Sequence, residues 1–471
     1  MAAPPNPAGR AARSADCAMA VAPFSATVTA YRWASGADAN NDGVPDAGAT
    51  LAQVSAGGAA LGFDSSVALT PLAGSQTPTG GVLGTLANGT VSGFSAGTAS
   101  VANLAYSEVG SFQLNTSGVV SNYLGSGLAL NALVFNAAGS QNSRVGRFTP
   151  AGFGVSGGSV THRVEQSCAV ASGFSYLDEF FRLGFTLTAL NSAGATTQNY
   201  TGSFARLDLA SPANFKLAGI AGATMFKTGN ARLALGSSTG SWSAGVASVS
   251  LTARALRAAA PDGPFDSAAF GIAPVDLDGV GVLTPDLDTD APANGADSVK
   301  LGGTIPLRYG RLRLQNAMGP QGRSLALPLA AQYWTGTAFT TNTLDSCTRI
   351  STGNLSFGNL RNVTAANATL VGSSSAVSAG IGRLTLAAPG SSGRASYDVA
   401  IALDAATPPA DASCPKTASG WVPAKAATAG ANLAALRGAW CGSTAGSDPS
   451  ARATWGLYRG ADGVLYQREN Y

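Results

Sequence analysis

The chain has 471 residues, of which only 11% are charged and 60 are glycine, and its formal net charge is +3. This length is too great for one compact core and suggests two to four domains. A nearly neutral chain without a block of Lys and Arg is not expected to bind a nucleic-acid backbone. Short Val, Leu, Phe and Thr runs between Gly, Asn, Ser and Pro clusters disfavour long helices, so the composition predicts a mostly β protein.

The first segment, residues 1–20, is rich in Ala, Pro and Arg and is predicted to be a linker. It lacks the apolar core of roughly 7 to 15 residues that an export signal needs. No stretch of the chain approaches the roughly 18 apolar residues of a membrane helix. Two hypotheses follow: the protein is cytosolic, or the chain is a fragment whose export signal lies elsewhere. The low charge and the β composition favour the fragment.

The pattern changes to strands at Phe24, and residues 25–33 are rich in β-forming side chains. Turn signals then recur about every 8 to 12 residues, which is typical of a sandwich. We therefore predict a β-sandwich domain over 21–145. An immunoglobulin-like domain is predicted over 146–260, because residues 185–200 have the pattern of a hairpin with an Asn-Ser-Ala-Gly turn.

The remaining chain divides by composition. Residues 261–299 are rich in Pro and Asp and are predicted to be an acidic connecting region, and 300–471 to be a C-terminal β domain. Within that domain, Leu433 and Leu436 have the spacing of a short helix between glycines. A repeat period of roughly 20 to 50 residues is missing, which disfavours a solenoid. The alternative fold is a parallel β-helix, which shares this composition.

The cysteines predict disulfides rather than a metal site. There is no C-x-x-C spacing, so neither a zinc site nor a thioredoxin-like dithiol is expected. One or two disulfides formed in an oxidising compartment are expected, with at least one thiol left over. The five residues concerned are Cys17, Cys168, Cys347, Cys414 and Cys441. The last three lie in the predicted C-terminal domain, so we expect a bridge there, although the spacing does not choose the pairing.

The strongest local chemical pattern is that of a calcium loop. Oxygen donors at relative positions 1, 3, 5, 7 and 9 surround a glycine at position 6, as at the start of such loops. The donors are Asp38, Asn40, Asp42, the Val44 carbonyl and Asp46. Ala49 occupies position 12, where a standard EF-hand has a bidentate Glu. Calcium is therefore the one cofactor that the sequence suggests, and an ordinary Asn/Asp/Gly turn is the alternative interpretation.

A second acidic cluster lies in the predicted connecting region. If extended, alternate aspartates there would share one face, and a cation would relieve their repulsion. A solvated loop would relieve it equally well. The residues are Asp276, Asp278, Asp286, Asp288 and Asp290.

Serine hydrolysis is disfavoured. The pattern G-x-S-x-G occurs around Ser95, Ser156 and Ser238, but a chain so rich in Gly and Ser produces it by chance. A serine hydrolase needs the order Ser, acid, His with room between them. His162, the only histidine, precedes Ser238 and follows Ser156 by too few residues, so only Ser95 keeps this order. The composition does not predict the α/β scaffold that Ser95 would need. We expect a structural histidine.

Other candidate groups have weaker patterns. Glu108, Asp178 and Glu179 lie near apolar runs, where a carboxylate pair could cleave glycosides, but no spacing pairs them. Aromatic residues could line a sugar-binding face, although core packing is the simpler interpretation. These are Trp33, Tyr333, Trp334, Trp421, Trp440 and Trp455.

Several segments resemble the C-terminal region of MshQ-like proteins, which are encoded with mannose-sensitive haemagglutinin (MSHA) type IV pilus genes in Gram-negative bacteria. The most specific are RYGRLRLQNA at 308–317, AQYW at 331–334, DSC at 345–347 and DPSARATWGLYRG at 448–460. Weaker ones are YSEVG at 106–110, GRFTP at 146–150 and QNYTG at 198–202. The resemblance implies a cell-surface or extracellular protein that belongs to a longer exported chain.

These observations together predict an all-β protein of tandem immunoglobulin-like β-sandwich domains. The resemblance implies a non-enzymatic, pilus-associated role in adhesion or pilus assembly, with pilus components or surface glycans as partners. A carbohydrate-active enzyme or its sugar-binding accessory module is the alternative. A purely structural spacer is the third.

Overall fold

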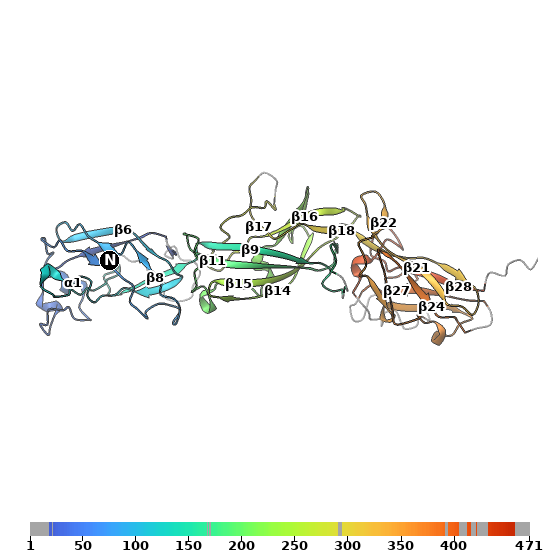
Figure 1. Ribbon diagram of the computed structural model, residues 1–471, viewed down its shortest axis with the longest axis horizontal. Coiled ribbons are helices and arrows are strands. Elements are labelled where there is room, and N and C mark those ends of the chain that lie inside the picture. Colours follow the sequence, from blue (N-terminus) through green and yellow to red (C-terminus); the bar gives the residue numbers. More distant parts are fainter. Residues whose placement is uncertain are drawn as a thin grey trace, which may run out of the picture.

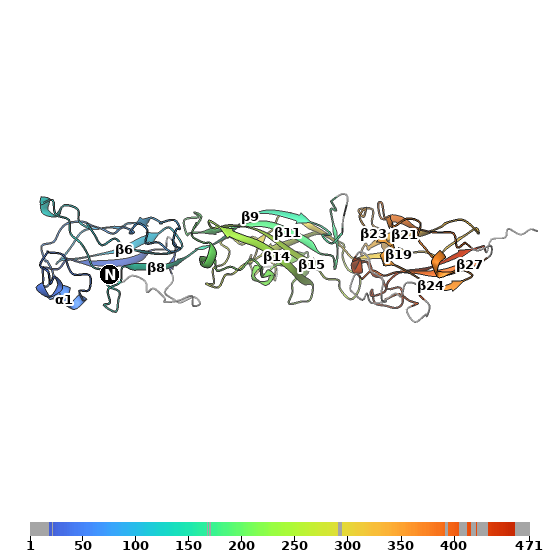
Figure 2. The same cartoon turned by 90° about the horizontal axis from the view of Figure 1, so that it is seen from below.

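The computed structural model describes residues 18–20, 22–166, 168, 171–290, 294–390, 394–404, 412–415, 421 and 432–456. Three β domains follow one another in a row along the long axis (Figures 1 and 2). Each domain contains two main sheets, in which most strand pairs are antiparallel, and the two sheets share one apolar core. The predicted all-β architecture of tandem immunoglobulin-like sandwiches is therefore confirmed. Within the described part of the chain, no helix is long and apolar enough to cross a membrane.

The first domain is built around an aromatic core. Phe112 and Phe148 are completely buried, and both rings contact Tyr106. One sheet has the order β1-β8-β7 and the other β2-β6-β4, with a small β3-β5 ladder beside them. The strands are β1 (Ala18–Met19), β2 (Phe24–Thr29), β3 (Val67–Ala68), β4 (Leu86–Ala87), β5 (Thr90–Val91), β6 (Thr98–Tyr106), β7 (Gly110–Gln113) and β8 (Arg144–Thr149).

One short α-helix, α1 (Leu51–Ser55), lies at the end of the first domain that points away from the middle domain (Figures 1 and 2). It begins with a capping box, in which the Thr50 side chain accepts from the Gln53 backbone N–H and the Gln53 side chain accepts from the Thr50 N–H. All other described helices are 3₁₀ turns. They are η1 (Ser35–Ala37), η2 (Tyr123–Gly125), η3 (Gly202–Phe204), η4 (Pro212–Phe215), η5 (Thr352–Asn354), η6 (Ala365–Asn367) and η8 (Ala434–Leu436).

The middle domain contains the longest strands. In β11 (Phe181–Leu190) every second side chain is buried, because the two faces of a strand alternate and only one faces the core. One sheet has the order β14-β15-β11-β9, and the other has the order β10-β18-β16-β12-β13 with β17 beside β16. The other strands are β9 (Gly152–Thr161), β10 (Ser175–Tyr176), β12 (Ala218–Ala221), β13 (Thr224–Phe226), β14 (Leu233–Ser243), β15 (Val246–Ala255), β16 (Phe265–Ile272), β17 (Val299–Lys300) and β18 (Ile305–Arg308).

Two sequence-based expectations for this domain are corrected. Residues 261–299 do not connect two domains: β16 lies in the interior of the second sheet, and its Phe270 and Ile272 side chains are completely buried in the middle core. Residues 185–200 do not form a two-stranded hairpin either. β11 pairs with β9 and β15, and after the turn only one bridge, between Leu190 and Thr196, is made.

The C-terminal domain packs around Trp455 and Tyr397, which are both completely buried. One sheet has the order β19-β21-β22 with β26 beside β21, the other has the order β20-β28-β27-β24, and β23 pairs with β25. The strands are β19 (Gly310–Leu314), β20 (Ala317–Gly319), β21 (Leu325–Trp334), β22 (Phe339–Thr341), β23 (Arg349–Ser351), β24 (Leu355–Arg361), β25 (Ser374–Ala376), β26 (Ile381–Leu386), β27 (Ala395–Ile401) and β28 (Ser450–Trp455). The short helix expected near Leu433 is the single turn η8.

Candidate functional sites at the two domain junctions

Several residues of the segments that resemble MshQ-like proteins lie where two domains meet: Glu108, Arg147, Asn199, Asp345 and Cys347. We call the contact between the first and middle domains the first junction, which contains Val82, Glu108, Arg147, Asn199 and Asp278. The contact between the middle and C-terminal domains is the second junction, which contains Tyr176, Arg163, Glu179, Asp345, Thr348 and the Cys168–Cys347 disulfide. Both junctions are visible between the sandwiches in Figure 1.

At the first junction, side chains bind backbone groups of the opposite domain. The buried Glu108 carboxylate accepts hydrogen bonds from the backbone N–H groups of Gln198 and Asn199, both at 3.1 Å. The Asn199 amide donates to the Val82 carbonyl and accepts from the Val82 N–H, both at 2.8 Å. The Asn199 side chain therefore bonds both the N–H and the C=O of Val82, as a residue of a neighbouring strand would. Burial raises the pKa of Glu108, although these N–H groups oppose the shift.

An ion pair adds to the first junction. The Arg147 guanidinium donates through both terminal nitrogens to the buried Asp278 carboxylate, with 2.7 Å between Nη1 and Oδ1. The neighbouring Asp276 accepts from the Tyr200 hydroxyl at 2.8 Å, and burial raises the pKa of Asp276. The structure thus separates Asp276 and Asp278 from the other aspartates of the predicted acidic cluster. Asp278 fastens two domains together, whereas Asp276 bonds Tyr200 within the middle domain.

At the second junction, a buried arginine joins acidic groups of two domains. The Arg163 side chain has no exposed surface. Its Nε donates to Glu179 of the middle domain at 2.9 Å, its Nη1 donates to Asp345 of the C-terminal domain at 2.8 Å, and its Nη2 donates to Thr348 at 2.9 Å. Buried charges are costly unless they are paired and hydrogen-bonded, and every guanidinium nitrogen has a partner here.

Asp345 is the centre of this network. It accepts from the Tyr176 hydroxyl at 2.9 Å and from the Thr348 hydroxyl at 2.6 Å. Burial alone would raise the pKa of Asp345, but Arg163 and the Thr348 hydrogen bonds hold it below its usual value. For Glu179 burial prevails, and its pKa is raised despite Arg163. The network therefore holds a charged Asp345 between two domains.

A disulfide crosses the second junction beside this network. It joins Cys168 of the middle domain to Cys347 of the C-terminal domain, with 4.9 Å between the Cα atoms. A second disulfide, Cys414–Cys441, lies within the C-terminal domain, where we expected a bridge among three cysteines of one domain. Cys17 lies outside the described residues. Sequence reasoning did not find the interdomain bridge, because nothing in a spacing of 179 residues indicates that two cysteines meet.

The cores of the two domains also interlock at the second junction. Phe174 and Tyr176 come from the middle domain but pack in the C-terminal core, and Tyr309 packs in the middle core. The Arg257 guanidinium lies over the Tyr309 ring, 4.6 Å from its centroid, and donates to the Gly310 carbonyl. Aromatic and arginine contacts of this kind are typical of stable interfaces.

The carboxylates considered for glycoside hydrolysis are occupied by these junction contacts. A cavity of about 380 Å³ at the second junction is lined by Glu165, Asp178 and Glu179, together with three arginines and small apolar residues. Glu179 pairs with Arg163, and Asp178 accepts from the Arg257 N–H at 3.0 Å. Glu108 belongs to the first junction. No tryptophan lines the cavity within the described part of the chain.

The predicted calcium loop holds an exposed tryptophan. The Trp33 indole N–H donates to the buried Asp38 carboxylate at 2.9 Å, and this bond lowers the pKa of Asp38. The Gly43 N–H donates to the same Asp38 oxygen at 2.8 Å. Trp33 is nevertheless 60% exposed. It adjoins α1, because the Arg32 N–H donates to the Gly58 carbonyl just beyond that helix.

The other predicted calcium ligands also bond within the loop. Asp42 accepts from the Asn40 side chain and the Val44 N–H, and Asp46 accepts from the Ala39 N–H at 2.9 Å. The bond from the Val44 N–H to Asp42 is that of an Asx turn, the alternative interpretation of this segment. Calcium binding at Asp38, Asn40, Asp42, Val44 and Asp46 stays a prediction, and a cation there would compete with these N–H groups.

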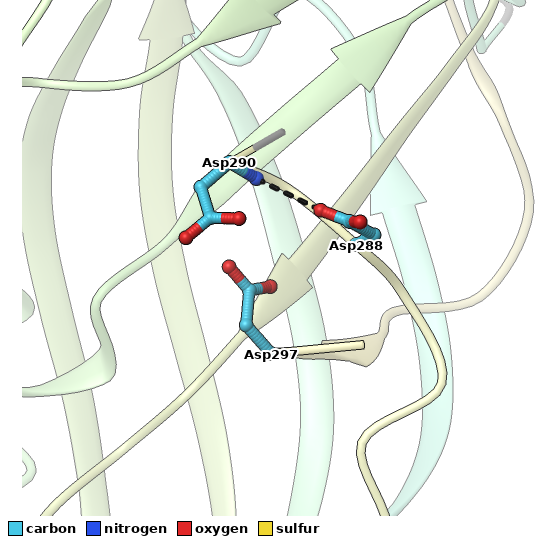
Figure 3. Close-up of side chains that lie close together, drawn as sticks. All are labelled: Asp288, Asp290 and Asp297. Atoms are coloured by element: carbon cyan, nitrogen blue, oxygen red, sulfur yellow. Dashed lines mark hydrogen bonds between the residues drawn. The ribbon is translucent and has the colours of Figure 1, made fainter. Parts of the chain in front are cut away.

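Three other carboxylates lie close together in the loop between β16 and β17. Figure 3 shows Asp290 and Asp297 turned toward each other, with Asp288 beside them. One oxygen of each lies within 4.8 Å of the others, and this is the only such group in the described ranges. Asp297 accepts from the Thr289 hydroxyl, and Asp286 accepts from the Lys300 N–H. The sequence pattern had indicated Asp288 and Asp290 but not Asp297.

His162 has a structural contact. Its Nδ1 lies 3.1 Å from the hydroxyl of Ser175, which is completely buried. Burial lowers the pKa of His162. Within the part of the chain that the structure describes, none of Ser95, Ser156 and Ser238 is hydrogen-bonded to this ring. The expected structural role of the histidine fits this environment.

Comparison with known proteins yields two domain matches. Residues 108–301 match the third domain of DUF6701, and residues 308–470 match its fourth domain. No curated protein matches the chain.

Several solved structures are distantly similar to the chain. The Escherichia coli adhesin FdeC is 13% identical with a TM-score of 0.25, over 72% of this chain and 82% of its own. The titin I-band fragment I67–I69 is 10% identical with a TM-score of 0.22, over 84% and 94%. The T6 backbone pilin of Streptococcus pyogenes is 12% identical with a TM-score of 0.17, over 65% and 61%. These likenesses are too distant to bear on function.

Proposed function

The chain belongs to the DUF6701 family through two adjacent domains, and we propose that it is a non-enzymatic protein of the Gram-negative bacterial surface. We propose further that it is associated with an MSHA-like type IV pilus and acts in adhesion or pilus assembly. The resemblance of segments 308–317 and 448–460 to MshQ-like proteins supports this assignment. Two disulfides support export, because such bonds persist in oxidising compartments.

One observation carries the proposal: five residues of the segments that resemble MshQ-like proteins connect domains, while others, such as Arg452 with Asp398, bond within one domain. Glu108, Arg147 and Asn199 fasten the first junction, and Asp345 and Cys347 fasten the second. Residues that serve catalysis would be expected to converge on one cleft. Residues that fix the relative position of sandwiches suit an extended scaffold that presents a surface away from the cell.

Trp33 supports surface glycans as the partner class, alongside pilus components. Its indole is held by Asp38, yet 60% of the residue is exposed. The neighbouring Arg32 bonds Gly58 just beyond α1, the helix at the end of the first domain that points away from the middle domain. An exposed aromatic ring whose N–H is fixed by Asp38 can stack on the apolar face of a sugar ring. The sugar-binding alternative is thus retained as a property of the adhesin.

The test is a deletion of the gene in its own bacterium, complemented with the wild-type chain or with Trp33→Ala. We expect surface immunolabelling of the protein, fewer attached cells or fewer pili in the deletion strain, and rescue by the wild type. Trp33→Ala should restore the labelling but reduce glycan-array binding at least tenfold. Labelling confined to the cytosol, or release of reducing ends from glycans by the purified chain, would contradict the proposal.

A further inference from the structure

One strand runs the length of the middle domain and connects its two junctions. β9 continues from β8 of the first domain, pairs with β11 from Gly152 to Thr161, and ends beside Arg163 of the second junction. Figure 1 shows β9 extending along the domain from one neighbour toward the other. Five residues beyond Arg163, Cys168 is bonded to Cys347 of the C-terminal domain.

The disulfide therefore creates a short covalent route through the molecule. From β8 this route follows β9 to Cys168, crosses the disulfide and continues from Cys347 toward β28. It omits residues 169–346, a closed loop that contains most of the middle domain and the first strands of the C-terminal domain. The omitted strands are β10 to β22.

We propose that β9 and the Cys168–Cys347 disulfide are the load path of the protein, so that tension along the row of domains bypasses the fold of the middle domain. This is a mechanical function in addition to the proposed role in adhesion or pilus assembly. It rests on the proposed function only for the source of the tension, which for a surface protein is attachment at one end and anchorage at the other.

The geometry of a strand suits this role. A strand already rises about 3.3 Å per residue, and a fully extended chain reaches at most about 3.6 Å per residue. β9 therefore lengthens very little even if its hydrogen bonds to β11 break. The seven residues from His162 to Cys168 add little slack, and the disulfide after them is covalent. Strands of the closed loop, such as β15 and β16, carry no tension along this route.

Other features of the molecule do not provide such a route. The first junction is held by hydrogen bonds and the Arg147–Asp278 ion pair, which separate without breaking covalent bonds. The Cys414–Cys441 disulfide closes a loop of only 27 residues inside the C-terminal domain. It is therefore a matched control, because its removal tests the loss of a disulfide without altering the route through the middle domain.

The experiment is single-molecule pulling of the full chain by handles fused to its two ends. Three proteins are compared: the wild type, the double variant Cys168→Ser/Cys347→Ser and the control double variant Cys414→Ser/Cys441→Ser. We expect complete extension of the first variant to exceed that of the wild type by about 600 Å, since 179 residues become extensible at about 3.4 Å each. The control should gain only about 90 Å from its 27 residues.

Equal full extension of the wild type and the Cys168→Ser/Cys347→Ser variant would overturn the proposal. If that variant does not fold, the wild type is held at constant force and dithiothreitol is added. A step of ~600 Å after reduction, in addition to the ~90 Å released by Cys414–Cys441, supports the load path, and full lengthening before reduction overturns it. The experiment involves no cells, so a failure of the surface assignment and a failure of the load path remain distinguishable.

Discussion

At the first junction, side chains bind backbone groups across the boundary, as Asn199 binds Val82, whereas at the second junction charged side chains from both domains are buried together around Arg163. A hydrogen bond to the backbone contributes about 0.5 to 1.5 kcal/mol net. Breaking a buried ion pair by removing one partner costs about 3 to 5 kcal/mol. The second junction also has a disulfide. The ion pair of the first junction, Arg147–Asp278, has a partly exposed arginine, whereas Arg163 is completely buried. The difference implies that the middle and C-terminal domains behave as one unit, from which the first domain separates more easily.

The largest effect is expected from Arg163→Ala. This change leaves Glu179 and Asp345 buried without their cation, so the free energy of unfolding of the middle and C-terminal domains should fall by about 3 to 5 kcal/mol. Denaturant unfolding followed by circular dichroism measures the loss. Arg452→Ala is the control, because its ion pair with Asp398 is partly exposed and should contribute less than about 1 kcal/mol. Equal losses in the two variants would contradict the assigned role of Arg163.

The double variant Cys168→Ser/Cys347→Ser should have the next largest effect. Loss of a disulfide that closes a long loop should lower the free energy of unfolding by about 2 to 4 kcal/mol. The two domains should then unfold in separate calorimetric transitions rather than together. A single transition at the wild-type temperature would show that the disulfide does not couple them.

Asn199→Ala tests the first junction. It removes the two partly buried hydrogen bonds to the N–H and C=O groups of Val82, each of which contributes about 0.5 to 1.5 kcal/mol. We expect faster proteolytic separation of the first domain and an unchanged second junction. Asn214→Ala, which removes an exposed amide, is the control. Protection equal to the wild type would mean that the Asn199 amide does not hold the domains together.

A smaller difference between the junctions is expected in how their stability depends on pH, because Glu108 and Asp345 have pKa values shifted in opposite directions. Glu108 has a raised pKa in the folded state, so between its ordinary pKa near 4.5 and the raised value the folded protein binds more protons than the unfolded chain. Its contribution to stability therefore falls as pH rises through this window. Asp345 has a lowered pKa, so its contribution is complete above its ordinary pKa and is lost as pH falls through the lowered value.

Glu108→Gln checks this sign. The variant should remove only the Glu108 contribution to the pH dependence of the first domain, measured as its melting temperature between about pH 4 and 7. The slope of the middle and C-terminal unit should not change. A melting temperature that falls more steeply with rising pH in the variant than in the wild type would mean that the Glu108 pKa is lowered instead.

Calcium should have the smallest effect. A cation at residues 38–46 must displace the N–H groups that now bond Asp38, Asp42 and Asp46, so we expect a rise in the melting temperature of the first domain only near millimolar calcium, about 10⁻³ M. Asp42→Asn should abolish the rise, and Asp297→Asn should not. The absence of any rise at about tenfold higher calcium would leave the turn as the correct interpretation.

Much of the fold could be predicted because β strands have a local pattern. The alternation in β11, where Phe181, Leu183 and Phe185 face the core, is visible in the sequence. The place of β16 was not predictable from composition, since the Pro- and Asp-rich segments around it resemble a linker. What makes β16 part of the middle domain is its pairing with the distant strands β12 and β18.

The junctions were still less accessible to sequence reasoning. The segments that hold Glu108 and Asn199 were noticed separately, but their contact depends on how two sandwiches are placed. Arg163 and Asp345 are 182 residues apart, and nothing local indicates that they pair. The loop at 38–46 illustrates the opposite difficulty, because Asp and Asn have the same spacing in a turn as in a metal site.

The most direct test of the covalent second junction is non-reducing peptide mapping of the exported protein. Trypsin cuts after Lys and Arg, so each described cysteine falls in its own peptide: residues 164–182, 324–349, 395–416 and 438–452. The structure predicts one linked pair of 164–182 with 324–349 and another of 395–416 with 438–452. Recovery of peptide 324–349 linked to 395–416 or 438–452, or with a reduced Cys347, would contradict the account.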